Sequence, residues 1–244
     1  MLKEKLQKLK RVLGVPDPET KIDDVAEEST NDIELTEISE IIPTKEEKEE
    51  MDIEIDEGYL QYSAEVVGFE NREMQWNSYR TIMSYTDSND ILDFGCGRGD
   101  LYSFLKTEDP GEVYTYTGID MNEPLIKAGN EAHEGINLIH TDWFQLPEKV
   151  EADWVVNAGS CNLRYDADLT KDDLTYTQDT IKNMFQHCKK GIILLLASTF
   201  TETDDGLVNH NPGELFNWAQ EEFGNVAIDH SVGKDVFSLI IYKV

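Results

Sequence analysis

One ten-residue stretch places the strongest constraint on the fold of this 244-residue chain. It runs from Ile91 to Asp100 and reads Ile-Leu-Asp-Phe-Gly-Cys-Gly-Arg-Gly-Asp, a strand-like apolar run followed by a glycine-rich loop and the start of a helical pattern. Glycines allow a tight turn and let a ligand approach the backbone closely. In a doubly wound α/β sheet, nucleotide-like ligands lie at the first strand-to-helix turn. The stretch therefore predicts such a sheet, with a ligand site at this turn.

The pattern from about Gln61 to Val244 agrees with that fold class. Strand-like runs occur at Ile91–Phe94, Val113–Ile119, Ile136–His140, Trp154–Val156 and Ile192–Ala197. Helical spacing occurs at Glu70–Tyr85, Asp100–Lys106, Glu123–Ala132, Asp173–Cys188 and Pro212–Glu222. This alternation predicts a parallel sheet covered by helices on both faces. The runs Val226–Ser231 and Val236–Tyr242, joined through Gly233-Lys234, predict an antiparallel hairpin at the end of the domain.

Residues 1–60 have a different composition from the rest of the chain. They contain one aromatic residue, Tyr59, and residues 21–57 carry 16 acidic and 3 basic side chains. Such a segment buries too little apolar surface to order itself, so we predict an acidic tether that is largely disordered or extended. Before it, leucines at positions 2, 6, 9 and 13 predict one apolar face of a short amphipathic helix. This helix is either a frayed terminus or a docking peptide for a protein partner.

The overall charge and the cysteine content exclude several classes of protein. The chain has 50 acidic and 21 basic residues, a formal net charge of −29, which disfavours binding to nucleic-acid phosphates. No apolar stretch reaches the roughly 18 residues of a membrane span. Its three cysteines are too scattered for a disulfide framework or a metal site. We therefore expect a cytoplasmic protein without a membrane segment or a bound metal.

The residues around the glycine loop indicate which ligand it holds. The loop has the spacing GxGxG, which differs from the GxGxxG of dinucleotide-binding loops, and GxxxxGK[ST] is absent. Asp93 and Asp100 flank it, so a pyrophosphate would face two carboxylates. S-adenosylmethionine carries an ammonium, a sulfonium and no phosphate, and it suits this charge. An NAD-dependent oxidoreductase remains compatible with Asp120 alone, because such an acid after the second strand binds ribose hydroxyls.

At these residues the sequence resembles the class I S-adenosylmethionine-dependent methyltransferases, from about Gln61 to Val244. The run from Asp93 to Asp100 matches the first motif of that family, and Thr117-Gly118-Ile119-Asp120-Met121-Asn122 matches the second. The block 158–163 and the helix end at 187–191 look like a subgroup from bacteria and phages whose substrate is unknown. The resemblance implies a Rossmann-like, doubly wound, seven-stranded sheet with an antiparallel C-terminal strand. It also implies the cytoplasm of a bacterial cell or phage host.

The resemblance assigns cofactor roles by position to the first half of the domain. Asp93 would orient the methionine ammonium, directly or through water. Gly95, Gly97 and Gly99 would let the loop pass beneath the ligand. Asp120 would bind the ribose hydroxyls, and Met121 would pack against the adenine.

Further cofactor roles fall on the second half and on the helix before the loop. Asp142 would accept a hydrogen bond from the adenine amino group, and Trp143 would flank the ring. Asn157, or Ala158 beside it, would face the methionine end. Arg80 would pair with the methionine carboxylate, unless it is a surface arginine.

The acceptor side is less specific. The run Asn157–Asn162 lacks the Asn/Asp-Pro-Pro-Tyr/Phe motif of adenine, cytosine and glutamine N-methyltransferases. Cys161 lacks the preceding proline of a cytosine-C5 nucleophile and is interpreted as a packed thiol. The candidate general bases are Tyr165, Asp166, His210 and His230, of which we select His210 and Tyr165. The alternatives for these two are a surface histidine and a lid aromatic.

Two functions remain open from the sequence. The first is methyl transfer to a small-molecule or protein acceptor. The alternative is a methyltransferase-fold interaction module without turnover, recruited into a virion or another assembly through residues 1–60.

Overall fold

The computed structural model describes residues 64, 69, 71–162, 173–201, 208–231 and 233–244. The amphipathic helix and acidic tether predicted within residues 1–60 lie outside these ranges, as does Tyr165. None of the helices in the described ranges is long and apolar enough to cross a bilayer.

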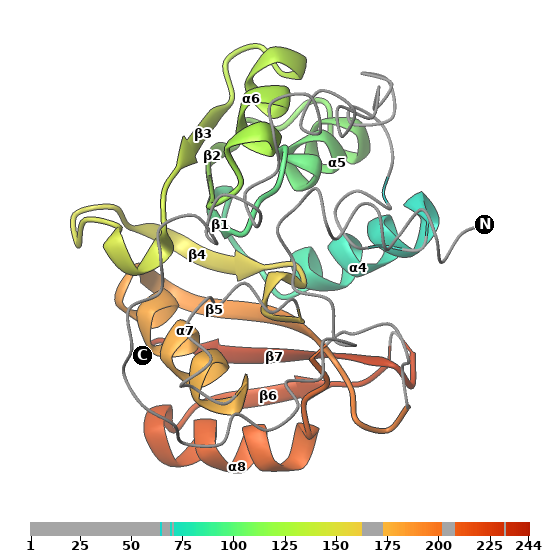
Figure 1. The fold of residues 1–244 in the computed structure, drawn as a ribbon, viewed down its shortest axis with the longest axis vertical. Helices are drawn as coiled ribbons and strands as arrows, with labels where there is room; N and C mark the ends of the chain where they lie inside the picture. Colours follow the sequence, from blue (N-terminus) through green and yellow to red (C-terminus); the bar gives the residue numbers. More distant parts are fainter. Residues whose placement is uncertain (1–63, 65–68, 70, 163–172, 202–207, 232) are drawn as a thin grey trace, which may run out of the picture.

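The described domain is built on a seven-stranded sheet of order β3-β2-β1-β4-β5-β7-β6 (Figure 1). The strands are β1 (Asp90–Phe94), β2 (Thr115–Asp120), β3 (Asn137–His140), β4 (Ala152–Asn157), β5 (Cys188–Ala197), β6 (Val226–Asp229) and β7 (Val236–Tyr242). Strands β1 to β5 pair in parallel, whereas β7 lies antiparallel between β5 and β6. The predictions of a mostly parallel sheet and an antiparallel C-terminal hairpin are confirmed.

In the described ranges, five helices and two short 3-10 turns precede or connect the strands. They are α4 (Arg72–Ser84), α5 (Asp100–Glu108), α6 (Glu123–Ala132), α7 (Asp173–Gln186), α8 (Pro212–Phe223), η3 (Trp143–Gln145) and η4 (Ser160–Asn162). Asparagine caps begin three of the helices: the side chains of Asn71, Asn122 and Asn211 each accept a backbone N–H of the first turn. The helix predicted to end at Cys188 instead ends at Gln186, because Cys188 already pairs with Ala152 in the sheet.

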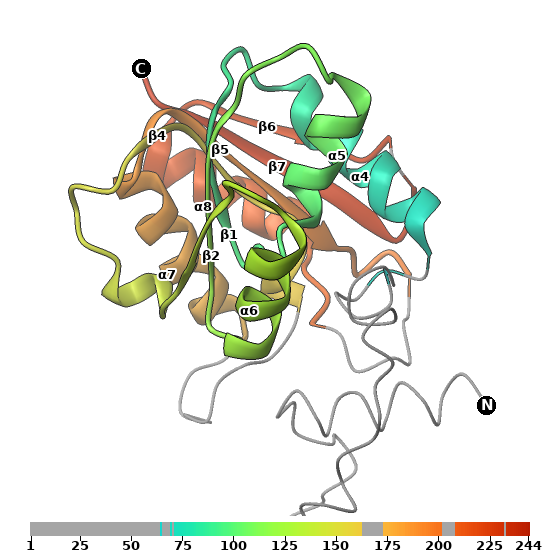
Figure 2. The same cartoon turned by 90° about the horizontal axis from the view of Figure 1, so that it is seen from above.

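Helices cover both faces of the sheet (Figure 2), and a hydrophobic core lies on each face. Successive strand residues alternate between them: Leu92 packs on the α7 and α8 side, and Ile91 on the α4, α5 and α6 side. All five residues of β1 except Asp90 are buried. A central strand that is covered on both faces has a nearly continuous apolar sequence. This explains why β1 could be predicted from the sequence.

The strand order also fixes where a ligand can lie. From β1 the chain moves outward to β2 and β3, then returns to the other side of β1 and continues through β4 and β5. The direction of winding therefore reverses between β1 and β4. In open α/β sheets, ligands bind outside the carboxyl ends of the strands at such a reversal. Here these ends are Phe94, which leads into the glycine loop, and Asn157.

Candidate active site

The glycine loop between β1 and α5 has a backbone that favours glycine. Gly95, Gly97 and Gly99 all have positive φ, at 73°, 57° and 81°. A Cβ on Gly95 would overlap the side chain of Ser160, and one on Gly99 would lie 2.6 Å from Cδ1 of Ile136. The loop thus packs directly against its neighbours. Close packing and a positive φ both favour glycine at position 95, whereas at position 99 the positive φ is the stronger reason.

Asp120, at the end of β2, holds the loop in place. One carboxylate oxygen accepts the N–H of Gly97 and the other accepts the N–H of Asn122, both at 2.8 Å. Burial raises the pKa of Asp120, while these two hydrogen bonds act to lower it. The structure therefore brings Asp120 to the glycine loop, where its carboxylate is bound to the backbone.

Asp93, one residue before the end of β1, has a buried carboxylate oxygen that no donor reaches. Its side chain is 2% exposed. Oδ2 accepts a 2.6 Å hydrogen bond from the hydroxyl of Tyr116, but buried Oδ1 has no hydrogen-bond partner. Burial, with smaller contributions from the charges of Asp120 and Asp100, raises the pKa of Asp93 to about 7. Because an unpaired buried acceptor is costly, a ligand N–H at Oδ1 would be stabilising.

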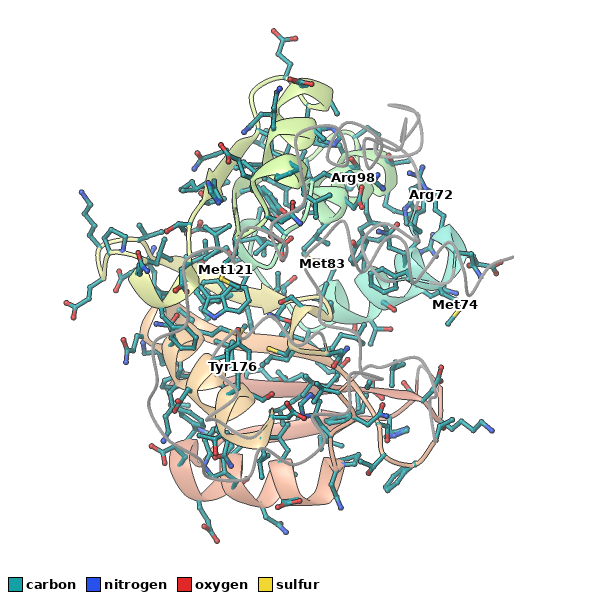
Figure 3. All side chains as sticks on the ribbon, in the orientation of Figure 1. Arg72, Met74, Met83, Arg98, Met121 and Tyr176 are labelled. Carbon is teal, nitrogen blue, oxygen red and sulfur yellow. The ribbon has the colours of Figure 1, made fainter. Side chains whose placement is uncertain are left out.

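Asp100, at the start of α5, differs from what the sequence indicated. Its carboxylate accepts hydrogen bonds from Nε of Arg98 at 3.0 and 3.2 Å, and from Nε2 of Gln75 at 3.1 Å. Arg98 is 1% exposed and lies beside α5 (Figure 3). The negative charge expected to meet a ligand at Asp100 is thus offset by Arg98. Nothing in the local sequence shows that a loop arginine would turn inward, and neither Arg98 nor Gln75 was expected at the site.

The turns after β2 and β3 hold the residues assigned to the adenine. Met121 is partly buried and is marked in Figure 3. Asp142 caps η3, since its Oδ1 accepts the N–H of Phe144 at 2.9 Å. Trp143 is only 1% exposed and stacks on Phe94 in the core, with ring centroids 6.4 Å apart. The ring that this turn leaves open is Phe144, at 43% exposed. Sequence reasoning missed it, because only the turn geometry decides which of two adjacent rings faces inward.

Asn157, at the end of β4, is fully buried and holds the following turn. Its Nδ2 donates to Oγ of Ser160 at 2.6 Å, and its Oδ1 accepts the N–H of Gly159 at 3.3 Å. Ser160 in turn donates to the carbonyl of Phe94 at 3.4 Å. These contacts join the carboxyl ends of β4 and β1. The structure therefore places Asn157 at the predicted end of the sheet, with its side chain engaged in that junction.

Arg80 contacts Glu108 rather than the glycine loop. It lies on the outer side of α4, about half exposed, with Nε and Nη2 each 3.0 Å from a carboxylate oxygen of Glu108. Its environment is that of a surface arginine, and we leave it out of the proposed site.

His210 is buried rather than exposed on a surface loop. It is 3% exposed and forms an isolated bridge with Ser198 just beyond β5. Nε2 lies 3.4 Å from the carbonyl oxygen of Cys161, which can only accept, so Nε2 carries the proton. Burial lowers the pKa of His210. The imidazole is therefore neutral near pH 7, with Nδ1 as its basic nitrogen.

Cys161, in η4, is 1% exposed, and burial raises the pKa of its thiol to about 12. A thiol with this pKa is a packing residue, because nucleophilic cysteines need an accessible thiolate. Across the described ranges, no group of three or more His, Cys, Asp or Glu side chains is placed to hold a metal ion.

A family model described as a methyltransferase domain matches residues 86–229, more than half of the chain. The chain belongs to this methyltransferase family. The matched region begins before β1 and ends at β6, so it includes the glycine loop and every strand except β7. A search of curated proteins finds no match to the methyltransferase chain.

Solved structures share the fold of this methyltransferase domain. The plantazolicin methyltransferase BpumL, in complex with a triazolic desmethylPZN analog and SAH, is 14% identical with a TM-score of 0.54, covering 72% of this chain and 87% of its own. Magnesium protoporphyrin IX methyltransferase (ChlM) from Synechocystis, with bound SAM, is 13% identical with a TM-score of 0.51, covering 71% and 81%. A TehB-like SAM-dependent methyltransferase from Corynebacterium glutamicum is 15% identical with a TM-score of 0.50, covering 69% and 88%. The predicted class I methyltransferase fold is confirmed.

Proposed function

We propose that the domain is an S-adenosylmethionine-dependent methyltransferase that acts on a small-molecule or protein acceptor. The observation that carries this proposal is the buried Oδ1 of Asp93, an acceptor without a donor beside the glycine loop. The solved neighbours with bound SAM or SAH support the choice of cofactor.

The cofactor, when bound, supplies an electrophilic methyl group on a sulfonium. Oδ1 of Asp93 then accepts a charge-assisted hydrogen bond from the ammonium. This bond also gives the buried carboxylate oxygen the donor that it lacks. The glycines keep side chains out of the space above the loop. Asp120 keeps the loop attached to β2 and offers its carboxylate to the ribose, and Met121 contacts the adenine beside Asp142.

We place the acceptor beyond the ends of β4 and β5. Much of the rate of methyl transfer can come from holding two reactants in line, and a base is needed only where the acceptor must lose a proton. Asn157 holds the wall of this region. His210 is the proposed base, acting through Nδ1, and Tyr165 remains a second candidate.

Calorimetric titration of the full chain with S-adenosylmethionine tests this function, with NAD as the competing ligand. Micromolar binding of the first and none of the second is expected. Asp93→Asn should weaken binding by about 2 kcal/mol, or roughly 30-fold, because it removes a hydrogen bond between charged groups.

The matched control is Asp90→Asn, three residues before Asp93 at the start of β1, where the carboxylate is partly exposed and pairs with Lys189. Its affinity for S-adenosylmethionine should equal that of the parent protein. Equal affinity in the Asp93 variant, or preferential binding of NAD, would overturn the proposal.

A further inference from the structure

We propose that Phe200 is a stacking platform for a planar aromatic or heteroaromatic ring of the methyl acceptor, a ring without negative charge. This inference rests on the proposed function and adds an acceptor class to it. The platform consists of Phe200, His230 and Phe237.

The three rings form a column that runs from the core to the surface. Phe237 is fully buried, and His230 stacks on it with centroids 6.0 Å apart and planes 9° apart. Phe200 stacks on His230 at 5.2 Å and 28°. These separations are those of offset-stacked aromatic pairs. Phe200 is 68% exposed, so the column ends in an open ring.

Hydrogen bonds hold the outer two rings in this arrangement. The hydroxyl oxygen of Ser198 accepts the N–H of Phe200 at 3.2 Å and lies 3.1 Å from Nε2 of His230. Ser198 also donates its own N–H to the carbonyl of Asp235 at 2.7 Å. An exposed phenylalanine normally gains by turning inward, but here the chain is held before Phe200 by these bonds and after it by the hydroxyl of Thr201, which donates to the carbonyl of Lys234 at 3.2 Å. A rigid ring loses little conformational entropy when it binds.

The position of the column links it to the acceptor side. Ser198 directly follows β5, and the N–H of Thr199 donates to the carbonyl of His210 at 3.0 Å. The platform therefore adjoins the proposed base at the carboxyl ends of the strands, where ligands of this fold class lie. Because β5 separates it from β4, it would contact a part of the acceptor remote from the methylated atom.

The charge around the column selects the kind of ring. Asp229 precedes His230, and hydrogen bonds from Ser231 and Tyr85 lower its pKa, so this carboxylate is ionised at neutral pH. An anionic ring would be repelled, whereas a neutral or cationic ring would not.

The test uses the full chain and 2-naphthol, with decahydro-2-naphthol as a neutral probe of similar size that has no aromatic face. Binding is followed by the ring signal of His230 in proton–carbon NMR. The chain has five histidines, so a His230→Gln variant assigns that signal. We expect 2-naphthol to shift it saturably and to bind about fivefold more tightly than the saturated alcohol. 2-Naphthoate should bind more weakly than 2-naphthol.

Phe200→Ala should weaken 2-naphthol binding about fivefold, and Phe200→Trp should retain it. Val113→Ala, at another highly exposed apolar residue, is the control and should change nothing. Equal binding of the two alcohols, or unchanged binding in Phe200→Ala, would overturn the platform. S-adenosylmethionine titration of the same variants reads the proposed function separately: platform binding without cofactor binding would refute only that function.

Discussion

The two sides of the carboxyl edge of the sheet use their polar side chains differently. On the cofactor side, formed by the ends of β1 and β2 and the glycine loop, Asp93 keeps a buried oxygen without a partner. On the acceptor side, formed by the ends of β4 and β5 with η4 and His210, the buried amides are bonded within the protein. Asn162, for example, accepts the N–H of Ala197 at 2.9 Å and donates to the carbonyl of Leu195 at 3.4 Å.

We infer from this difference that the two ligands of the proposed methyltransferase are recognised in different ways. On the proposed cofactor side, the unpaired oxygen of Asp93 is fixed by the central strands, so this side would be preformed for its ligand. On the acceptor side, the buried amide side chains form hydrogen bonds that hold the turns of the protein itself. We therefore propose that exposed side chains such as Phe200 recognise the acceptor.

The largest expected effect comes from removing the ion pair beneath the cofactor side. Arg98→Met leaves the buried Asp100 carboxylate without its cation, which should cost about 3–5 kcal/mol of unfolding free energy. Urea denaturation measures this loss. The control is Arg80→Met, which breaks the exposed pair with Glu108 and should not change stability measurably. A stable Arg98→Met protein would contradict the view that the loop rests on this pair.

Next in size is the contact that joins the two sides. Gly95→Ala places a methyl group against Ser160 at a positive φ and should cost about 2–4 kcal/mol, with loss of cofactor binding. Gly135→Ala is the matched control, because Gly135 has φ of 80° but nothing within 4 Å of the added Cβ. It should cost about 1–2 kcal/mol at most.

Replacing Ser160 by glycine in the Gly95→Ala protein should recover part of that loss, since the overlapping side chain is removed. If Gly95→Ala and Gly135→Ala cost the same, the close packing between loop and η4 is not what requires glycine.

A smaller effect is expected from pH, and it belongs to the cofactor side alone. The pKa of Asp93 is raised from 3.8 to about 7, so between these values the folded protein holds a proton that the unfolded chain has lost. Stability therefore falls as the pH rises through this window. An ammonium needs the ionised form, so affinity for S-adenosylmethionine should rise about tenfold from about pH 6 to about pH 7.5.

Calorimetry in buffers of different ionisation enthalpy should detect the proton released from Asp93 on binding. Asp93→Asn should remove both the pH dependence and this release. A flat pH profile in the parent protein would show that Asp93 is already ionised before the cofactor binds.

The smallest effect is expected on the acceptor side. His210→Leu removes the contact with the carbonyl of Cys161 and should cost about 1 kcal/mol, while leaving the affinity for S-adenosylmethionine unchanged. His210→Gln can still donate to that carbonyl and should recover stability. Thermal denaturation compares the two variants. Weaker cofactor binding in His210→Leu would show that the two sides are not independent.

Most of the fold could be predicted from the amino-acid sequence, and individual elements show why. Strand β1 is apolar because both of its faces are covered, and α8 begins with Asn211-Pro212, a cap followed by a proline at the first turn. The exact ends of helices and strands were harder to predict. In the sequence, residues 188–191 look like the charged end of the preceding helix. In the structure they form the start of β5, because pairing with β4 rather than local spacing decides where the strand begins.

The candidate site likewise has a part that could be predicted from the sequence and a part that could not. The glycine loop, the acids near the ends of β1 and β2, and hence the family could be predicted from the amino-acid sequence, because each depends on a few neighbouring residues. The environment of each of these groups became visible only in the folded structure: Arg98 neutralises Asp100, Trp143 is buried in the core while Phe144 is exposed, and Oδ1 of Asp93 has no hydrogen-bond partner. These outcomes depend on contacts between residues far apart in the chain, where burial and hydrogen bonding, rather than residue type, decide the role of each side chain.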